Sequence, residues 1–141
     1  MYKKFLAAIL CISFLEISFA SASEEYQKCI SQNDMPDFAL KQCVITETVR
    51  VEKIIKNTLQ KLATSPYYAN WKVYKQSPQN EIKTMFSEWE AYASTFCSFL
   101  AYADTQGEGT LYSLGSTSCF LGEANRFLNK INFINKTYEK K

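Results

Sequence analysis

The feature that most restricts what this chain can fold into is a set of four cysteines spread widely between residues 29 and 119. Cysteines that bind zinc as four thiolates usually come in close pairs such as C-x-x-C, and the chain contains no such pair. An even number of cysteines in a small exported protein instead indicates disulfide bonds. The four residues are Cys29, Cys43, Cys97 and Cys119.

The N-terminal segment indicates that the chain is exported. Lys3 and Lys4 precede an apolar run over residues 5–19, and the small residues Ala20 and Ala22 follow it. This is the pattern of a secretory signal peptide with cleavage after Ala22. We therefore expect residues 1–22 to be removed, and residues 23–141 to form one domain in an oxidising compartment, either periplasmic or extracellular.

Two other interpretations of this segment are weaker. A membrane-spanning helix needs about 20 apolar residues, whereas this run is shorter and is interrupted by Glu16. Lipidation at Cys11 would need small residues just before it, but Ile9 and Leu10 are bulky. No later stretch is long and uncharged enough to cross a bilayer. We expect no membrane association once the leader is cleaved.

The cysteines flank two candidate reversals of the chain symmetrically. One pair lies equally far from Pro36, and the other pair lies equally far from Glu108, which stands between two glycines. If both segments turn the chain back on itself, each pair of thiols comes face to face. Of the three possible connectivities, this symmetry favours the bonds Cys29–Cys43 and Cys97–Cys119.

Apolar residues recur at helical intervals in three segments, which predict helices over residues 37–63, 78–103 and 110–135. Asp34 is the expected cap of the first helix, and Ser77 followed by Pro78 is typical of a helix start. Trp89 and Phe96 lie on the apolar stripe of the second helix, so we expect them in the core. The predicted fold is a small all-α bundle of three main helices stapled by two disulfides.

The composition argues against most enzyme chemistries. The chain has no histidine, which excludes Ser-His-Asp and Cys-His catalysis and histidine zinc sites. The formal net charge is only +2, so a nucleic-acid partner is not expected. Neighbouring carboxylates such as Glu88 and Glu90 point to different faces of a helix and do not converge on a substrate. We expect no catalytic residue, no metal and no cofactor.

Two segments are candidates for binding a protein partner. The first is an aromatic cluster in the break between the first two helices, formed by Tyr67, Tyr68, Trp71 and Tyr74. Tyr and Trp are favoured anchors at interfaces, although packing of a loop onto the bundle is the simpler interpretation of the cluster. The second is the turn formed by Gly107, Glu108, Gly109 and Thr110, which the Cys97–Cys119 bond would hold in place.

The stretch from Trp89 to Cys119 also resembles a known family. It contains Trp89-Glu90-Ala91-Tyr92, a cysteine eight residues after the tryptophan, a glycine turn ending at Thr110, and a second cysteine nine residues later. With the two upstream cysteines, this framework is similar to that of the LprI-like lysozyme-inhibitor family. Polar residues of the family pattern are replaced here, by Ala93, Phe86, Glu52 and Lys56 among others.

The resemblance implies a secreted or periplasmic binding protein that inhibits lysozyme-type muramidases. We expect it to block the cleft sterically, with Glu108 at the tip of the 107–110 turn facing a basic partner. The replaced polar residues favour an alternative, an exported structural or interaction module without lysozyme inhibition. In both interpretations the protein works by contact and not as an enzyme.

Overall fold

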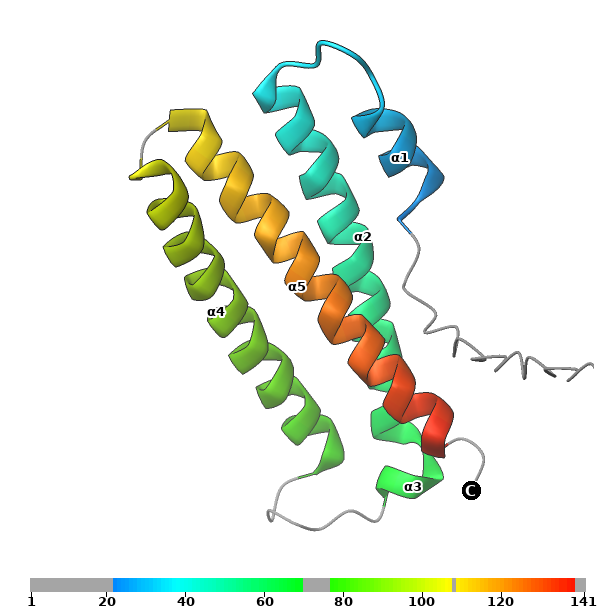
Figure 1. Cartoon of the computed structure of the whole chain (residues 1–141). Coiled ribbons are helices and arrows are strands. Elements are labelled where there is room, and N and C mark those ends of the chain that lie inside the picture. Colours follow the sequence, from blue (N-terminus) through cyan, green and yellow to red (C-terminus); the bar gives the residue numbers. More distant parts are fainter. Residues whose placement is uncertain (1–21, 70–76, 108, 139–141) are drawn as a thin grey trace, which may run out of the picture.

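The computed structural model describes residues 22–69, 77–107 and 109–138, so the expected leader up to residue 21 lies outside the described residues. The described chain is all-helical, and Figure 1 shows its elements in order. They are α1 (Glu24–Ile30), α2 (Asp37–Thr64), α3 (Pro66–Ala69), α4 (Pro78–Thr105) and α5 (Gly109–Tyr138).

The three long helices lie side by side, with α5 packed against both α2 and α4. Helices α2 and α5 run in one direction and α4 runs in the other (Figure 1). The all-α class and the three long helices agree with the sequence-based prediction. The prediction of only three helices was incomplete, because α1 packs along α2 and α3 follows α2.

Helix α1 is short and depends on its ends and on its contact with α2. The Ser23 hydroxyl accepts a hydrogen bond from the Tyr26 backbone N–H at 3.1 Å and so caps the helix. Acidic Glu24 and Glu25 lie in its first turn and Lys28 lies in its last turn, which complements the helix dipole. With seven residues, it is too short for hydrophobic periodicity to reveal.

The starts of two long helices test the predicted caps. Ser77 caps α4 by accepting a hydrogen bond from the Asn80 backbone N–H, and Pro78 occupies the first helical turn, as expected. Asp34 does not cap α2, because its backbone is left-handed, with φ of 59°, and Pro36 immediately precedes the helix. The left-handed residue turns the chain between α1 and α2 instead.

The hydrophobic core is centred between α2 and α5. Val51 and Ile55 of α2 and Leu128 of α5 are almost completely buried there. Trp89 of α4 packs at the edge of this core, with its ring stacked on Phe127 at 4.6 Å between centroids.

In its C-terminal half, helix α4 faces the bundle with small residues. Ala93, Cys97 and Ala101 are its buried side chains. Phe96 and Leu100 belong to the apolar stripe predicted to face the core. In the structure Phe96 is only half-buried and Leu100 is exposed, so this part of the stripe points away from the core. The small residues let α4 lie close to α5, where a Cβ built at Gly115 would be 3.6 Å from that of Ala101.

Both predicted disulfides are present. Cys29–Cys43 joins α1 to α2 and Cys97–Cys119 joins α4 to α5, with Cα–Cα distances of 6.0 and 5.4 Å. Pairing in this way leaves no set of four thiolates for zinc. Two disulfides are compatible with an oxidising compartment. None of the helices in the described ranges is long and apolar enough to cross a bilayer.

The position of the core can be tested with two leucines of the same helix. Leu128 is 1% exposed and Leu111 is 61% exposed. We expect Leu128→Ala to lower the free energy of unfolding by about 2–5 kcal/mol because it leaves a cavity. Leu111→Ala should change it by less than about 0.5 kcal/mol. Chemical denaturation measures both, and equal effects would contradict the packing described above.

Candidate functional site

The predicted 107–110 turn lies at the end of the bundle where α4 passes into α5 (Figure 1). Gln106, Gly107 and Gly109 all have left-handed backbones, with φ of 55°, 79° and 71°. Glu108, the expected tip residue, lies outside the described residues. Three positive φ values within four residues make this a sharp reversal whose form depends on its two glycines.

Contacts on both sides hold the turn to the bundle. The Thr110 hydroxyl donates a hydrogen bond of 3.3 Å to an Asp37 carboxylate oxygen at the start of α2. On the other side, the Tyr102 ring lies so close to Gly107 that a Cβ there would come within 2.6 Å of it. An apolar groove of about 360 Å³ lies beside the turn and includes Leu111 and Leu114. The turn therefore has the support that a contact loop needs.

Of the predicted aromatic cluster, the structure places Tyr68, which lies on α3 at the opposite end of the bundle. Tyr68 of α3 is half-buried against the core and meets the Tyr138 ring edge-to-face at 6.3 Å between centroids. Tyr68 therefore packs onto the bundle. Trp71 and Tyr74 lie outside the described residues, as does the side chain of Tyr67. Because Tyr68 and the 107–110 turn lie at opposite ends, they cannot form one binding surface (Figure 1).

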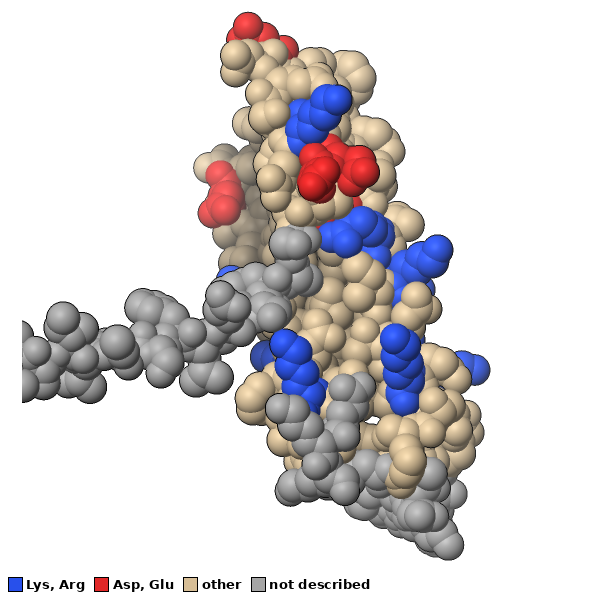
Figure 2. Space-filling model, turned by 90° about the vertical axis from the view of Figure 1, so that its right-hand side faces the viewer, with Lys and Arg blue, Asp and Glu red and all other residues tan. Residues whose placement is uncertain are grey.

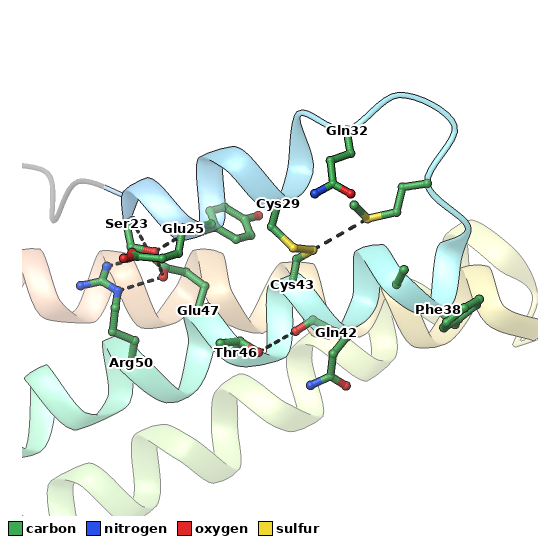
Figure 3. A pocket seen from close by; sticks show the side chains of 13 residues that line it. Ser23, Glu25, Cys29, Gln32, Phe38, Gln42, Cys43, Thr46, Glu47 and Arg50 are labelled. Atoms are coloured by element: carbon green, nitrogen blue, oxygen red, sulfur yellow. Dashed lines mark hydrogen bonds and ion pairs between the residues drawn. A yellow bond between two sulfur atoms is a disulfide. The ribbon is translucent and has the colours of Figure 1, made fainter.

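A larger groove of about 820 Å³, not anticipated from the sequence, runs between α1 and α2. Figure 3 shows its parts: the Cys29–Cys43 bond near the middle, Phe38 towards one end, and the Glu47–Arg50 pair at the other. Met35 lies over the disulfide, with its sulfur 3.8 Å from that of Cys43. One end of the groove is thus apolar and the other is charged.

The charged end is organised around the carboxylate of Glu47, which is 3% exposed. Arg50 binds it with two nitrogens, Nε to Oε2 at 2.8 Å and Nη2 to Oε1 at 2.7 Å. Ser23, 24 residues earlier in the chain, donates its backbone N–H to Oε1 at 3.0 Å and its hydroxyl to Oε2 at 2.7 Å. Four donors from two helical segments therefore meet on one buried carboxylate (Figure 3).

These donors determine the charge state of the site. Burial alone would favour the neutral acid, but the hydrogen bonds from Arg50 and Ser23 outweigh it and lower the pKa of Glu47 to about 2. Burial and the nearby Glu47 charge raise the pKa of the Tyr26 hydroxyl, so that it stays neutral. At neutral pH the site holds a fixed carboxylate whose hydrogen-bonding capacity is already used, which makes it unsuitable as a proton donor.

A second carboxylate of α2 faces the α4 side. Burial, followed by the charge of Glu90, raises the pKa of Glu52, while Lys56 opposes the shift. Lys56 itself lies over the Phe86 ring of α4, 5.1 Å from its centroid. Three of the positions where the chain departs from the family pattern, 52, 56 and 86, thus lie together where α2 meets α4. The described residues contain no group of three or more Cys, Asp or Glu that could hold a metal ion.

The outward side of α4 carries a surface that the sequence analysis missed. Tyr92 is 59% exposed and Phe99 is 67% exposed, and Met85 and Glu88 are exposed as well. These four residues, spaced by three, four and seven, share one side of the helix, which we call the outer face of α4. Phe96 lies beside it with its ring stacked on Tyr92, 5.7 Å between centroids.

Comparisons with protein-family models, with curated proteins and with solved structures find no match to this chain.

The Glu47 network predicts how stability depends on pH. Since folding lowers the pKa of Glu47 from 4.5 to about 2, its contribution is present above pH 4.5 and is lost as the pH falls towards 2. We expect this contribution to be about 3 kcal/mol. Urea denaturation between about pH 6 and pH 2.5 should therefore show a smaller acid-dependent loss of stability for Glu47→Gln than for the unchanged protein.

The control for this experiment is Glu123→Gln, since Glu123 also pairs with an arginine three residues later but its partner Arg126 is exposed. We expect this control to change stability by less than about 1 kcal/mol. An identical acid response in the unchanged protein and the Glu47→Gln variant would contradict the assigned network.

Replacement by alanine should have opposite effects on stability at a glycine of the turn and at a glycine inside a helix. Gly107→Ala places a Cβ on a left-handed backbone and against the Tyr102 ring, so we expect it to cost about 1–2 kcal/mol. Gly122→Ala, inside α5 with nothing within 4 Å of the new Cβ, should stabilise by up to about 1 kcal/mol. Thermal unfolding measures both, and a stabilising Gly107→Ala would contradict the turn geometry.

Proposed function

We propose that this protein is an exported, non-enzymatic binding module that contacts a cationic protein through the outer face of α4. The observation that carries the proposal is the exposure of large aromatic side chains along one side of a long helix, with Tyr92 and Phe99 at its centre. Exposed apolar surface of this kind is typical of protein-interaction sites. Aromatic residues are also enriched among those that contribute most to binding.

The rest of the bundle leaves this face available. The buried residues of α4, Ala93, Cys97 and Ala101, lie on the opposite side of the helix and face α5 and α2. The Cys97–Cys119 bond fixes that rotation, so the aromatic side cannot turn inwards without breaking the bond. A rigid helix that presents fixed aromatic side chains loses little conformational entropy on binding.

The distribution of charge supports a cationic partner. Helix α4 contains four acidic residues, Glu81, Glu88, Glu90 and Asp104, and a single basic one, Lys83. In helix α2, by contrast, basic residues outnumber acidic ones. Figure 2 views the side of the molecule where α1 and α2 lie, and it shows basic side chains on the lower half of that side. With acidic residues concentrated on α4 and basic residues on α2, a positively charged partner would be attracted to α4.

Two observations support action by contact without turnover. The chain has no histidine to serve as a general base near neutral pH. Among the residues that the structure describes, the most buried carboxylate is that of Glu47, and it is already bound by Arg50 and Ser23.

Muramidase inhibition is the specific activity that the family resemblance implies, and a basic lysozyme has the charge that α4 favours. The 107–110 turn supports a second way of reaching the same activity, by insertion into the enzyme cleft. The observation in its favour is that Gly107 is packed by Tyr102 and Thr110 is bonded to Asp37. The alternative function, an exported structural or interaction module that does not inhibit lysozyme, uses the same outer face of α4.

The test measures binding of a basic lysozyme to the purified protein by calorimetry, together with lysis of a cell-wall suspension. We expect the double variant Tyr92→Ser, Phe99→Ser to lose at least about tenfold in affinity, because it removes the two most exposed aromatic side chains of the face. Glu108→Lys should lower inhibition if the turn enters the cleft, and unchanged inhibition would count against that route.

The matched control is Phe133→Ser, which removes an exposed aromatic residue from α5 and should leave affinity unchanged. Binding without inhibition would favour the interaction module. Absence of lysozyme binding, or a dimer of this chain that the double variant disperses, would contradict the proposed cationic partner.

A further inference from the structure

We propose that Glu47 is the receptor for the α-ammonium group that removal of the leader creates at Ser23. The Ser23 backbone nitrogen lies 3.0 Å from Oε1 of Glu47, and its hydroxyl oxygen lies 2.7 Å from Oε2. Ser23 is also the residue that the expected cleavage after Ala22 would leave at the N-terminus. The same nitrogen atom that donates as an amide would then carry the positive charge of the mature chain.

Because the Glu47 carboxylate is buried, a positive charge on the Ser23 nitrogen would be strongly attracted to it. Glu47 is 3% exposed, so its oxygens are largely shielded from water. The carboxylate is already charged, so cleavage adds a full positive charge on the donor, and the attraction between opposite charges is stronger where water is excluded. Cleavage would therefore convert an existing hydrogen bond into an ion pair with little change in position.

The surrounding charges also favour an added cation. Glu47 and Glu25 supply two negative charges near Arg50, and both act on the guanidinium to raise the pKa of Arg50. The fourth titratable group at this end of the groove, Tyr26, stays neutral because its pKa is raised. With the amide present, the cluster has one positive charge for two negative ones. An α-ammonium group at Ser23 balances it.

The chemical step that supplies the charge is hydrolysis of the Ala22–Ser23 peptide bond by a leader peptidase during export. Water adds to the Ala22 carbonyl carbon, the carbon–nitrogen bond breaks, and the Ser23 nitrogen leaves as an amine that takes up a proton. The Ala22 carboxylate departs with the leader. No oxidant or other co-reactant is needed.

The ion pair between the Ser23 α-ammonium group and Glu47 would make the stability of the fold depend on removal of the leader. Helix α1 is tied to α2 near its C-terminal end by Cys29–Cys43. The Ser23–Glu47 contact ties its other end, and Ser23 also caps the helix through its hydroxyl. Leader removal would thus strengthen the restraint at the end of α1 that lacks a covalent bond.

The first experiment identifies the N-terminus. The full-length chain is expressed in a bacterium that exports it, and the recovered protein is analysed by intact mass and N-terminal sequencing. We expect a chain that begins at Ser23 and carries both disulfides. A chain that retains its leader, or that begins at another residue, would overturn the proposal.

The second experiment measures the ion pair. Disulfide-intact protein beginning at Ser23 is compared with protein that keeps Ala22 as its first residue, so that Ser23 again contributes an amide. We expect the retained residue to lower the folding equilibrium constant at least fivefold, measured by urea denaturation. This expectation holds although Ala22 regains an exposed hydrogen bond between its carbonyl and the Gln27 side chain. No difference between the two forms would overturn the proposal.

The same comparison is repeated in two variants. In Glu47→Gln, keeping Ala22 should change the equilibrium constant less than twofold, because the charged receptor is gone. In Glu123→Gln, which removes a matched glutamate–arginine pair on α5, the fivefold effect should remain. An equal effect of Ala22 in all three proteins would overturn the assignment to Glu47. If Glu47→Gln does not fold, the comparison in the unchanged protein still decides the proposal.

Discussion

The packing of α5 against α2 is the interaction on which the rest of the structure depends. Val51, Ile55 and Leu128 form its centre and are shielded almost completely from water. Helix α4 joins this pair through small residues, a disulfide and the Trp89 ring stacked on Phe127, and α1 joins it through a second disulfide and the Glu47 network. These contacts use one side of α4 and leave its outer face exposed.

Much of the fold could be predicted because it rests on local signals. Helical periodicity, the Ser77–Pro78 start and the glycine turn located the long helices, and symmetry around the two reversals gave both disulfides. Periodicity could not show which side of α4 is buried, because apolar residues occur around much of this helix. The Cys97–Cys119 bond and the close approach at Gly115 turn the small residues inwards and leave Tyr92 and Phe99 outside.

The Glu47 network could not be predicted from the sequence either. Ser23 and Glu47 are 24 residues apart, and neither belongs to a motif that would link them. Only after α1 is placed on α2 does the predicted cleavage site turn out to lie beside a buried carboxylate. The candidate residues Gly107 and Tyr68 were located from local signals, but their packing against Tyr102 and Tyr138 depends on the folded bundle.

The function that we propose places the partner contact on the outer face of α4. The most direct measurement is an NMR titration of the labelled protein with a basic lysozyme, following every backbone amide. We expect the largest shift changes along α4 around Met85, Tyr92 and Phe99, with α2 unaffected at Val49. Changes confined to the 107–110 turn, or to the groove between α1 and α2, would contradict it.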